Sequence, residues 1–246
     1  MWTSPAIIPA LKSNQGHLWK IDSRTLKCSE VSCFSVLSED EKARADKFRF
    51  RRDRFIYVLA RGVLRKLLAS YIGKAANQID FEYNEQGKPS VQSASNVKFN
   101  VSHSRDMILI GFTRKADIGV DIEWNKRPIE IREVAKSFFS DREELDLFSL
   151  VEKDRLSAFY NCWTRKEAFI KAKGGGLSIP LDQFEVSLKP HSAPRLLSVL
   201  WDQTEVSKWN MKSFNIEKDY TCAVVTHNDD LTWQHYDGLH LLLTTN

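Results

Sequence analysis

The sequence predicts an α+β protein made of two similar subdomains, each a small antiparallel sheet packed with a long helix. Two observations predict this class: both halves of the chain carry a capping-box motif and a long amphipathic helical pattern, and both continue into short strand patterns. The 246 residues suffice for two small domains with cores of their own. We expect an N-terminal subdomain at residues 1–114 and a C-terminal one at residues 115–246.

The first half contains one clear helix start, one long helix and one hairpin. Ser38-Glu-Asp-Glu41 has the capping-box form, in which the Ser accepts from a backbone N–H and the Glu reaches back. Apolar residues near a 3.6-residue period predict a helix over 53–71, and Gly73 marks its end. Strict alternation predicts a strand over 97–102, and the apolar run 107–112 reads as its hairpin partner.

The second half repeats this order. Ser140-Asp-Arg-Glu143 is another capping-box form, and a long helical pattern follows over 153–173. Alternation at 184–188 and 214–216 and the buried run 222–226 predict strands. The repeated order suggests an internal duplication; the alternative is coincidence, because capping boxes are common.

Composition excludes several classes of protein. With 42% hydrophobic residues, 14 Phe and 7 Trp, and a net charge of only +4, the chain is expected to fold, and its charge is too dilute for a nucleic-acid coat protein. No apolar run approaches the ~20 residues of a bilayer-spanning helix. We see no secretory signal, so we expect a cytoplasmic protein, no membrane partner, and four reduced cysteines, since no C-x-x-C pair occurs.

Two carboxylates lie side by side on a predicted strand, in Ile118-Gly-Val-Asp-Ile-Glu-Trp124. Side chains alternate along a strand, so Asp121 and Glu123 project from one face, roughly 6.6 Å apart. One interpretation is a solvated strand face. The other is a divalent cation site, and oxygen-only ligands of this kind suit Mg²⁺.

A third carboxylate stands out in the helix that carries Trp163-Thr-Arg-Lys-Glu-Ala-Phe-Ile-Lys171. On a helical wheel Glu167 falls within the apolar stripe, and Lys171 lies one turn further on the same side. The simple interpretation is a Glu–Lys pair at the edge of the stripe. Because a buried carboxylate needs a cation, a proton or a donor, Glu167 is also a candidate third metal ligand.

The positive charge is concentrated in one segment of the first half. Its basic residues are Lys42, Arg44, Lys47, Arg49, Arg51, Arg52 and Arg54. A solvated helix and loop face is one interpretation; a surface for phosphates or an acidic partner is the other, because Arg binds phosphate through two parallel donors. Ser102 and His103 could supply further phosphate donors.

With these residues in hand, the chain resembles the 4'-phosphopantetheinyl transferase superfamily, in its larger, pseudo-dimeric, surfactin-synthetase-activating type. The matching motifs are Gly119-Val-Asp-Ile-Glu123, Trp163-x-x-Lys-Glu-Ala-x-x-Lys171, Gly87-Lys-Pro89 and Asn100-Val-Ser-His103. The resemblance covers about residues 37–225. It implies two α+β halves related by pseudo-twofold symmetry, with the active site in the cleft between them.

The resemblance also implies roles for single residues. Asp121, Glu123 and Glu167 would hold Mg²⁺ on the pyrophosphate of coenzyme A, with Glu167 and Lys171 as the catalytic residues. The groups implied to bind the coenzyme A phosphates are Arg52, Lys88, Ser102, His103, Lys171 and, more loosely, Arg44 and Lys47.

The implied reaction moves the phosphopantetheine arm of coenzyme A to a serine of an apo acyl or peptidyl carrier protein and releases 3',5'-ADP. Such reactions serve fatty acid, polyketide or nonribosomal peptide biosynthesis. We expect a monomer that binds no nucleic acid. Two alternatives remain open from the residues alone: a Mg²⁺-dependent nuclease or phosphohydrolase, and a basic nucleic-acid-binding module.

Overall fold

A computed structural model gives the structure of the protein for residues 1–25, 30–91, 96–227 and 230–238. The chain divides into two compact units. The first unit comprises residues 1–82, 89–115 and 231–246, and the second comprises residues 83–88 and 116–230. The predicted division after residue 114 places two short segments differently. In the structure, the turn 83–88 belongs to the second unit, and the tail from residue 231 belongs to the first.

The helices of the first unit begin and end where local chemistry dictates. They are α1 (Glu30–Phe34), α2 (Glu39–Asp46) and α3 (Arg51–Ile72). The capping box predicted at Ser38 and Glu41 is present at the start of α2. Helix α3 ends at Gly73, whose φ of 70° is left-handed, a conformation that glycine adopts without the steric cost of a Cβ.

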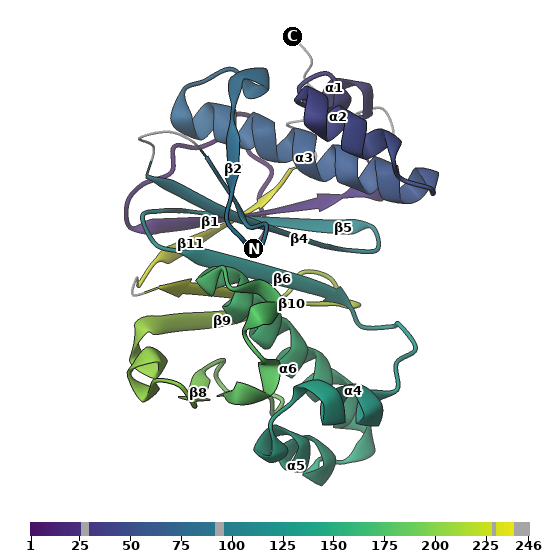
Figure 1. Ribbon diagram of the computed structural model, residues 1–246, viewed down its shortest axis with the longest axis vertical. Coiled ribbons are helices and arrows are strands. Elements are labelled where there is room, and N and C mark those ends of the chain that lie inside the picture. The colour runs from purple at the N-terminus through teal and green to yellow at the C-terminus, as the bar shows by residue number, and fades with distance from the viewer. Residues whose placement is uncertain (26–29, 92–95, 228–229, 239–246) are drawn as a thin grey trace. The chain divides into compact units, whose positions relative to one another are not determined.

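The main sheet of the first unit has the strand order β11-β1-β5-β4, and Figure 1 shows α3 lying across it. Its strands are β1 (Gln15–Asp22), β4 (Val97–Ser104), β5 (Met107–Arg114) and β11 (Thr232–Asp237). The hairpin predicted for the first half is confirmed as β4 and β5, joined at Arg105 and Asp106. Strand β1 pairs antiparallel with β5 and parallel with β11.

The core of the first unit lies between α3 and this sheet. Trp19 of β1 and Leu59 and Leu64 of α3 are fully buried within it. One buried ion pair ties the helices together: Glu41 of α2 lies 2.5 Å from Nε of Arg65 on α3. A smaller sheet is formed by β2 (Phe81–Tyr83) and β3 (Pro89–Val91).

The second unit contains α4 (Ile131–Phe138), α5 (Asp141–Ser149) and α6 (Glu152–Lys173). The predicted capping box is present at the start of α5, where Ser140 accepts from the backbone N–H of Glu143. Helix α6 ends at Gly174, which is left-handed with φ 74°. The helix predicted over 153–173 is therefore confirmed.

The sheet of the second unit has the order β6-β10-β9 and is fully antiparallel. Its strands are β6 (Ile118–Trp124), β9 (Trp209–Asn215) and β10 (Tyr220–His227), and β7 (Phe184–Val186) pairs with β8 (Leu196–Val199). In Figure 1, α6 packs along β6 and β10. The strand patterns extend too far at two places, since Leu188 and Ile216 lie beyond the ends of β7 and β9.

The two units share one order of elements, which confirms the predicted α+β class with two similar halves. Each has a first strand, short helices, a helix of 22 residues with a left-handed glycine at its end, and a hairpin that pairs with the first strand. Short 3₁₀ helices occur at Ser23–Thr25, Ala76–Gln78, Gly176–Ser178, Leu181–Gln183 and Gln203–Lys208.

Three cysteines of the described residues are free and buried: Cys33, Cys162 and Cys222. Cys28 lies outside the described residues. Within the part of the chain that the structure describes, no helix combines the length and the apolar character needed to cross a bilayer.

Candidate functional site

The carboxylate strand β6 lies directly against α6 because residue 119 is glycine. A Cβ built at Gly119 would stand 2.0 Å from the carbonyl oxygen of Ala168 and 2.3 Å from the backbone nitrogen of Ala172. No other residue type fits that space without moving the helix. Since side chains alternate, Asp121 and Glu123 follow Gly119 on the face toward α6.

Asp121 is buried and ion-paired with α6. Its side chain is 4% exposed, and Nζ of Lys171 lies 2.6 Å from its Oδ1. Burial lowers the pKa of Lys171, but the charge and hydrogen bond of Asp121 outweigh this effect, so the net shift is upward and Lys171 stays protonated. Asp121 is therefore part of an ordered polar site and not of a solvated strand face.

Glu167 completes a cluster of negative charge. Burial raises its pKa, and the nearby charges of Asp121 and Glu123 raise it further, while Lys171 lowers it. Glu167 and Glu123 are both half-buried. The structure thus brings together four predicted residues from a strand and a helix: Asp121, Glu123, Glu167 and Lys171.

The chemistry of this cluster suits a hard divalent cation. All three acids offer carboxylate oxygens, and their mutual repulsion, visible in the raised pKa of Glu167, is what a bound cation would relieve. Among the described residues, the structure contains no group of three or more His, Cys, Asp or Glu side chains arranged to hold a metal ion. One carboxylate oxygen of Asp121 accepts a hydrogen bond from the ammonium group of Lys171.

Lys88 lies at the C-terminal end of α6. Its Nζ is 2.8 Å from the carbonyl oxygen of Ala172 and 3.2 Å from that of Ile118. The turn that carries it is held to the same end of the helix, because the side-chain amide of Asn84 donates to the carbonyl oxygen of Gly174 at 2.8 Å. A cation here also complements the negative end of the helix dipole.

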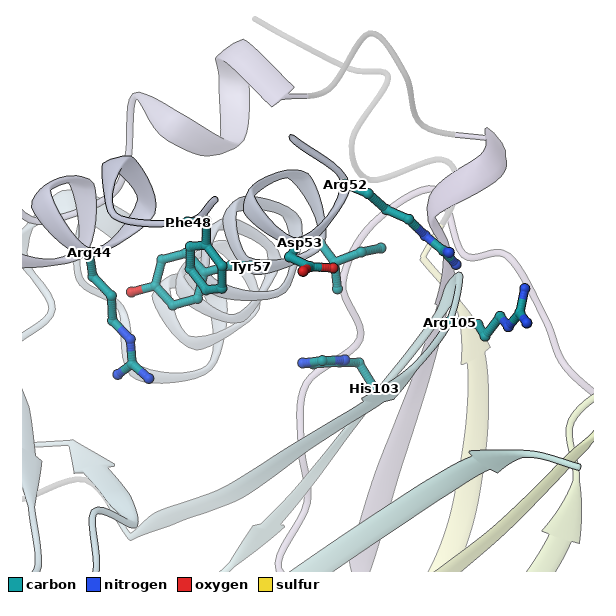
Figure 2. Close-up of a pocket in the computed structure, with 8 residues that line it drawn as sticks. Arg44, Phe48, Arg52, Asp53, Tyr57, His103 and Arg105 are labelled. Atoms are coloured by element: carbon teal, nitrogen blue, oxygen red, sulfur yellow. The ribbon is translucent and has the colours of Figure 1, made fainter. Parts of the chain in front are cut away.

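The first unit carries a basic hollow of about 670 Å³ over the N-terminal part of α3. The residues that line it are Arg44, Phe48, Arg52, Asp53, Ile56, Tyr57, His103 and Arg105. Figure 2 shows His103 on its strand below Asp53 of α3, with Arg44 and Arg52 projecting from the helices above. Three of the predicted phosphate contacts, Arg44, Arg52 and His103, thus lie around one hollow.

Contacts within the first unit orient two of these arginines. The guanidinium of Arg44 lies 5.5 Å from the ring centre of Tyr57, a cation–π distance. Arg52 donates to Oδ1 of Asp106 at 3.0 Å. Both side chains therefore have a defined direction before any ligand binds.

The other two predicted phosphate contacts of this unit are placed differently. Lys47 is the exposed C-cap of α2 and is not among the residues that line the hollow. Ser102 is buried in β4, and because neighbouring strand residues point to opposite faces, it lies on the other side of the sheet from His103. The structure thus separates these two neighbours.

Sequence reasoning missed Tyr57 and Arg105 of the hollow. Tyr57, whose ring centre lies 5.2 Å from that of Phe48, reads from sequence as an ordinary amphipathic-helix residue. Arg105 gave one usable signal, its position in a two-residue hairpin turn, where its φ of 54° is unusual for a non-glycine residue. Strained positions of this kind are frequent at functional sites.

Comparison with known proteins supports the resemblance. A family model described as "4'-phosphopantetheinyl transferase superfamily" matches residues 117–225, and one described as "4'-phosphopantetheinyl transferase, N-terminal" matches residues 24–113. Together these matches contain both the carboxylate cluster of the second unit and the basic hollow of the first.

Three curated relatives are similar over most of the chain. The 4'-phosphopantetheinyl transferase HetI of Nostoc sp. is 34% identical, with 76% of this chain and 79% of the relative covered. The 4'-phosphopantetheinyl transferase Sfp of Bacillus subtilis is 32% identical, with 83% and 90% covered. The human L-aminoadipate-semialdehyde dehydrogenase-phosphopantetheinyl transferase is 27% identical, with 79% and 68% covered. These matches over both units show that the chain belongs to the larger, Sfp-type 4'-phosphopantetheinyl transferase family and is a transferase of the holo-acyl-carrier-protein synthase type.

Proposed function

We propose that the chain transfers the 4'-phosphopantetheine arm of coenzyme A to a serine hydroxyl of an apo acyl or peptidyl carrier protein, in a Mg²⁺-dependent reaction that releases 3',5'-ADP. Family membership supports the transferase activity. The observation that carries the finer proposal is the polar cluster on β6 and α6, in which buried Asp121 faces Lys171 and Glu167 has a raised pKa.

Three carboxylates of this cluster would hold the metal ion: Asp121, Glu123 and Glu167. Mg²⁺ typically takes one or two protein carboxylates and fills its remaining positions with water and substrate phosphates. When bound, the ion would supply positive charge to the pyrophosphate of coenzyme A, which is the main requirement of phosphoryl-type transfer.

The phosphates of coenzyme A would be bound by cations of both units. Lys171 and Lys88 would act at the pyrophosphate, and the basic hollow of the first unit would bind a further phosphate through Arg44, Arg52 and His103. Arginine is suited to this role because its planar fork gives two parallel donors to one phosphate. Lys47 and Ser102 do not line this hollow and are proposed to contact coenzyme A outside it.

In the transfer step, the serine Oγ of the carrier forms a bond to the β-phosphorus of coenzyme A. The bond from that phosphorus to the bridging oxygen breaks, and its electron pair leaves with 3',5'-ADP. The serine proton goes to Glu167, directly or through an oriented water. As a carboxylate of the cluster that would hold the metal ion, Glu167 would lie close enough to the phosphate to accept this proton, and Lys171 would neutralise charge on the phosphate oxygens.

The test is intact-mass analysis of an apo carrier protein incubated with the enzyme, coenzyme A and Mg²⁺. We expect a mass increase of one phosphopantetheine group, and 3',5'-ADP in equal amount. A nuclease or phosphohydrolase would instead degrade coenzyme A without modifying the carrier. No adduct on any of several acyl and peptidyl carrier proteins would refute the proposal.

The chain is proposed to act as a monomer, because it carries both copies of the repeated unit. Size-exclusion chromatography with light scattering tests this statement directly. A dimer at micromolar concentration would contradict it.

A further inference from the structure

Lys166, which directly precedes Glu167 on α6, is fully buried and makes directional contacts with two other parts of the second unit. Its side chain is 0% exposed, and its Nζ lies 2.7 Å from Oε2 of Glu143 at the start of α5. The same ammonium donates to the backbone carbonyl oxygens of Leu181 at 2.6 Å and Phe184 at 2.5 Å. These two carbonyls belong to the segment that follows α6 and leads into β7.

Glu143 is itself held from several sides. Its Oε1 accepts from the backbone N–H of Val186 at 2.7 Å, and its Oε2 accepts from that of Ser140 at 3.0 Å. The Lys166 ammonium therefore meets a carboxylate whose direction is set by two further backbone groups. Apolar packing tolerates small rotations of a helix, whereas such a set of charged and hydrogen-bonded contacts does not.

The first unit contains the same arrangement without the carboxylate cluster. Arg65 stands eight residues before the left-handed glycine of α3, as Lys166 does in α6. It pairs with the capping-box residue Glu41 and donates to the carbonyl oxygens of Ala76 and Ile79, 2.9 Å away, in the segment after the helix. A buried cation at this position thus ties the long helix to the neighbouring segments in each unit.

The position of Lys166 around α6 determines where the functional residues point. At about 100° per residue, Glu167 lies about 100° and Lys171 about 140° around the helix from Lys166. On that side, Gly119 lets β6 approach the helix backbone, and Lys171 meets Asp121 at 2.6 Å. A rotation of α6 would move both side chains away from the strand.

We infer that Lys166 is a positioning residue: through Glu143 and the two carbonyls it holds α6 in the rotation that directs Glu167 and Lys171 at the carboxylates of β6. The inference rests on the proposed function of that cluster. Lys166 itself is buried away from solvent and takes no part in binding or proton transfer.

The experiment compares matched double variants in the two units, E143Q/K166M and E41Q/R65M. Each removes both members of the buried pair, so that neither Lys166 nor Arg65 is left without its carboxylate, and each keeps a glutamine that can still complete the capping box. Glu41 also pairs with Arg61, whose side chain is 14% exposed, so E41Q/R65M removes two ion pairs and is the more severe of the two changes. Unfolding by urea gives the fraction folded, and steady-state transfer to an apo carrier protein gives kcat and KM, both below the unfolding transition.

We expect both doubles to fold and to lose stability, but only E143Q/K166M to lose kcat per folded molecule, by about tenfold to 100-fold, as misplaced catalytic groups do. Its KM for the carrier protein should stay close to the wild-type value. Equal kcat for the two doubles, or wild-type kcat in E143Q/K166M, would overturn the inference. If a double variant does not fold, E143Q and E41Q are compared in the same way, and the same two outcomes decide. Absence of transfer by the wild-type chain would instead refute the proposed function.

Discussion

The ammonium group of Lys171 lies 2.6 Å from Oδ1 of Asp121, fifty residues earlier in the chain. This ion pair joins the second residue after Gly119 on β6 to the last turn of α6. It keeps a buried carboxylate and a half-buried cation oriented toward each other before substrate binds, so little reorganisation is needed when a phosphate or a metal ion arrives.

Replacing Asp121 with Asn should abolish the Mg²⁺-dependent part of coenzyme A binding. The amide keeps the volume of the side chain but has no negative charge for a cation, so affinity in Mg²⁺ should fall at least about tenfold, toward the value without Mg²⁺. Isothermal titration calorimetry with and without Mg²⁺ measures this. Asp219→Asn, at a half-buried residue paired with Lys126 at 3.7 Å, is the control and should bind normally. Unchanged affinity in Asp121→Asn would contradict the metal role.

Replacing Glu167 with Gln should lower kcat by about 100-fold or more, the usual contribution of a general base. Stability should not fall, because burial and the charges of Asp121 and Glu123 already disfavour the ionised form of this carboxyl group. Single-turnover transfer and urea unfolding on the same sample separate the two effects. Near-normal transfer by Glu167→Gln would exclude it as the base.

Replacing Arg52 with Ala should weaken coenzyme A binding by about tenfold, as expected for a lost charged hydrogen bond to phosphate. Arg49→Ala is the matched control, because Arg49 belongs to the same basic segment but stacks on exposed Phe50 and does not line the hollow. Affinities are compared at two salt concentrations. Equal losses in both variants would mean that the segment acts only through its overall charge.

Replacing Gly119 with Ala should destabilise the protein by about 3 kcal/mol, because the added Cβ would overlap the backbone of α6. Gly73→Ala tests a different cost, since Gly73 is left-handed but has open space around it, and should lose only about 1 kcal/mol. Gly119→Ala should also reduce transfer, whereas Gly73→Ala should not. The free energy of unfolding and kcat are measured for both.

Acid should destabilise the first unit through His17. This side chain is fully buried against Tyr71, whose hydroxyl lies 2.8 Å from its Nδ1, and burial lowers its pKa to about 4. The unfolded chain therefore binds a proton at His17 as the pH falls through about 6.5, whereas the folded chain binds it only near pH 4. The contribution of neutral His17 to the free energy of unfolding is therefore complete above pH 6.5 and is lost as the pH drops toward 4, by about 3 kcal/mol in total.

Urea unfolding between pH 7.5 and 4.5 tests this expectation. His17→Gln cannot titrate and should show a flatter dependence of the free energy of unfolding on pH than the wild type. His191→Gln, at an exposed position, should leave the wild-type dependence unchanged. Identical curves for His17→Gln and the wild type would place the acid sensitivity elsewhere.

The starts of α2 and α5 and the ends of α3 and α6 could be predicted because they depend on neighbours in sequence. The capping boxes at Ser38 and Ser140 satisfy backbone N–H groups within one turn, and Gly73 relieves a steric cost at a single residue. Strand β1 was missed for the opposite reason. Most of its residues are buried on both faces, so it lacks the alternation by which a strand is recognised, and its partner β11 comes from the other end of the chain.

The residues of the candidate site were likewise predicted only in part. Alternation on β6 placed Asp121 and Glu123 on one face, and the helical period placed Glu167 and Lys171 on one side of α6. Tyr57 of the basic hollow could not be recognised, because an aromatic residue in an amphipathic helix usually belongs to a core.

By itself, the sequence determined the α+β class, the two repeated halves, the family and which residue types carry the chemistry, since these follow from short-range periodicity and motifs. Only the tertiary structure decided that Asp121 is buried, that Lys171 pairs with it, and that Lys166 is locked to Glu143. These relationships join residues far apart in the chain. They depend on how closely a strand and a helix can pack, which Gly119 sets through the one Cβ it lacks.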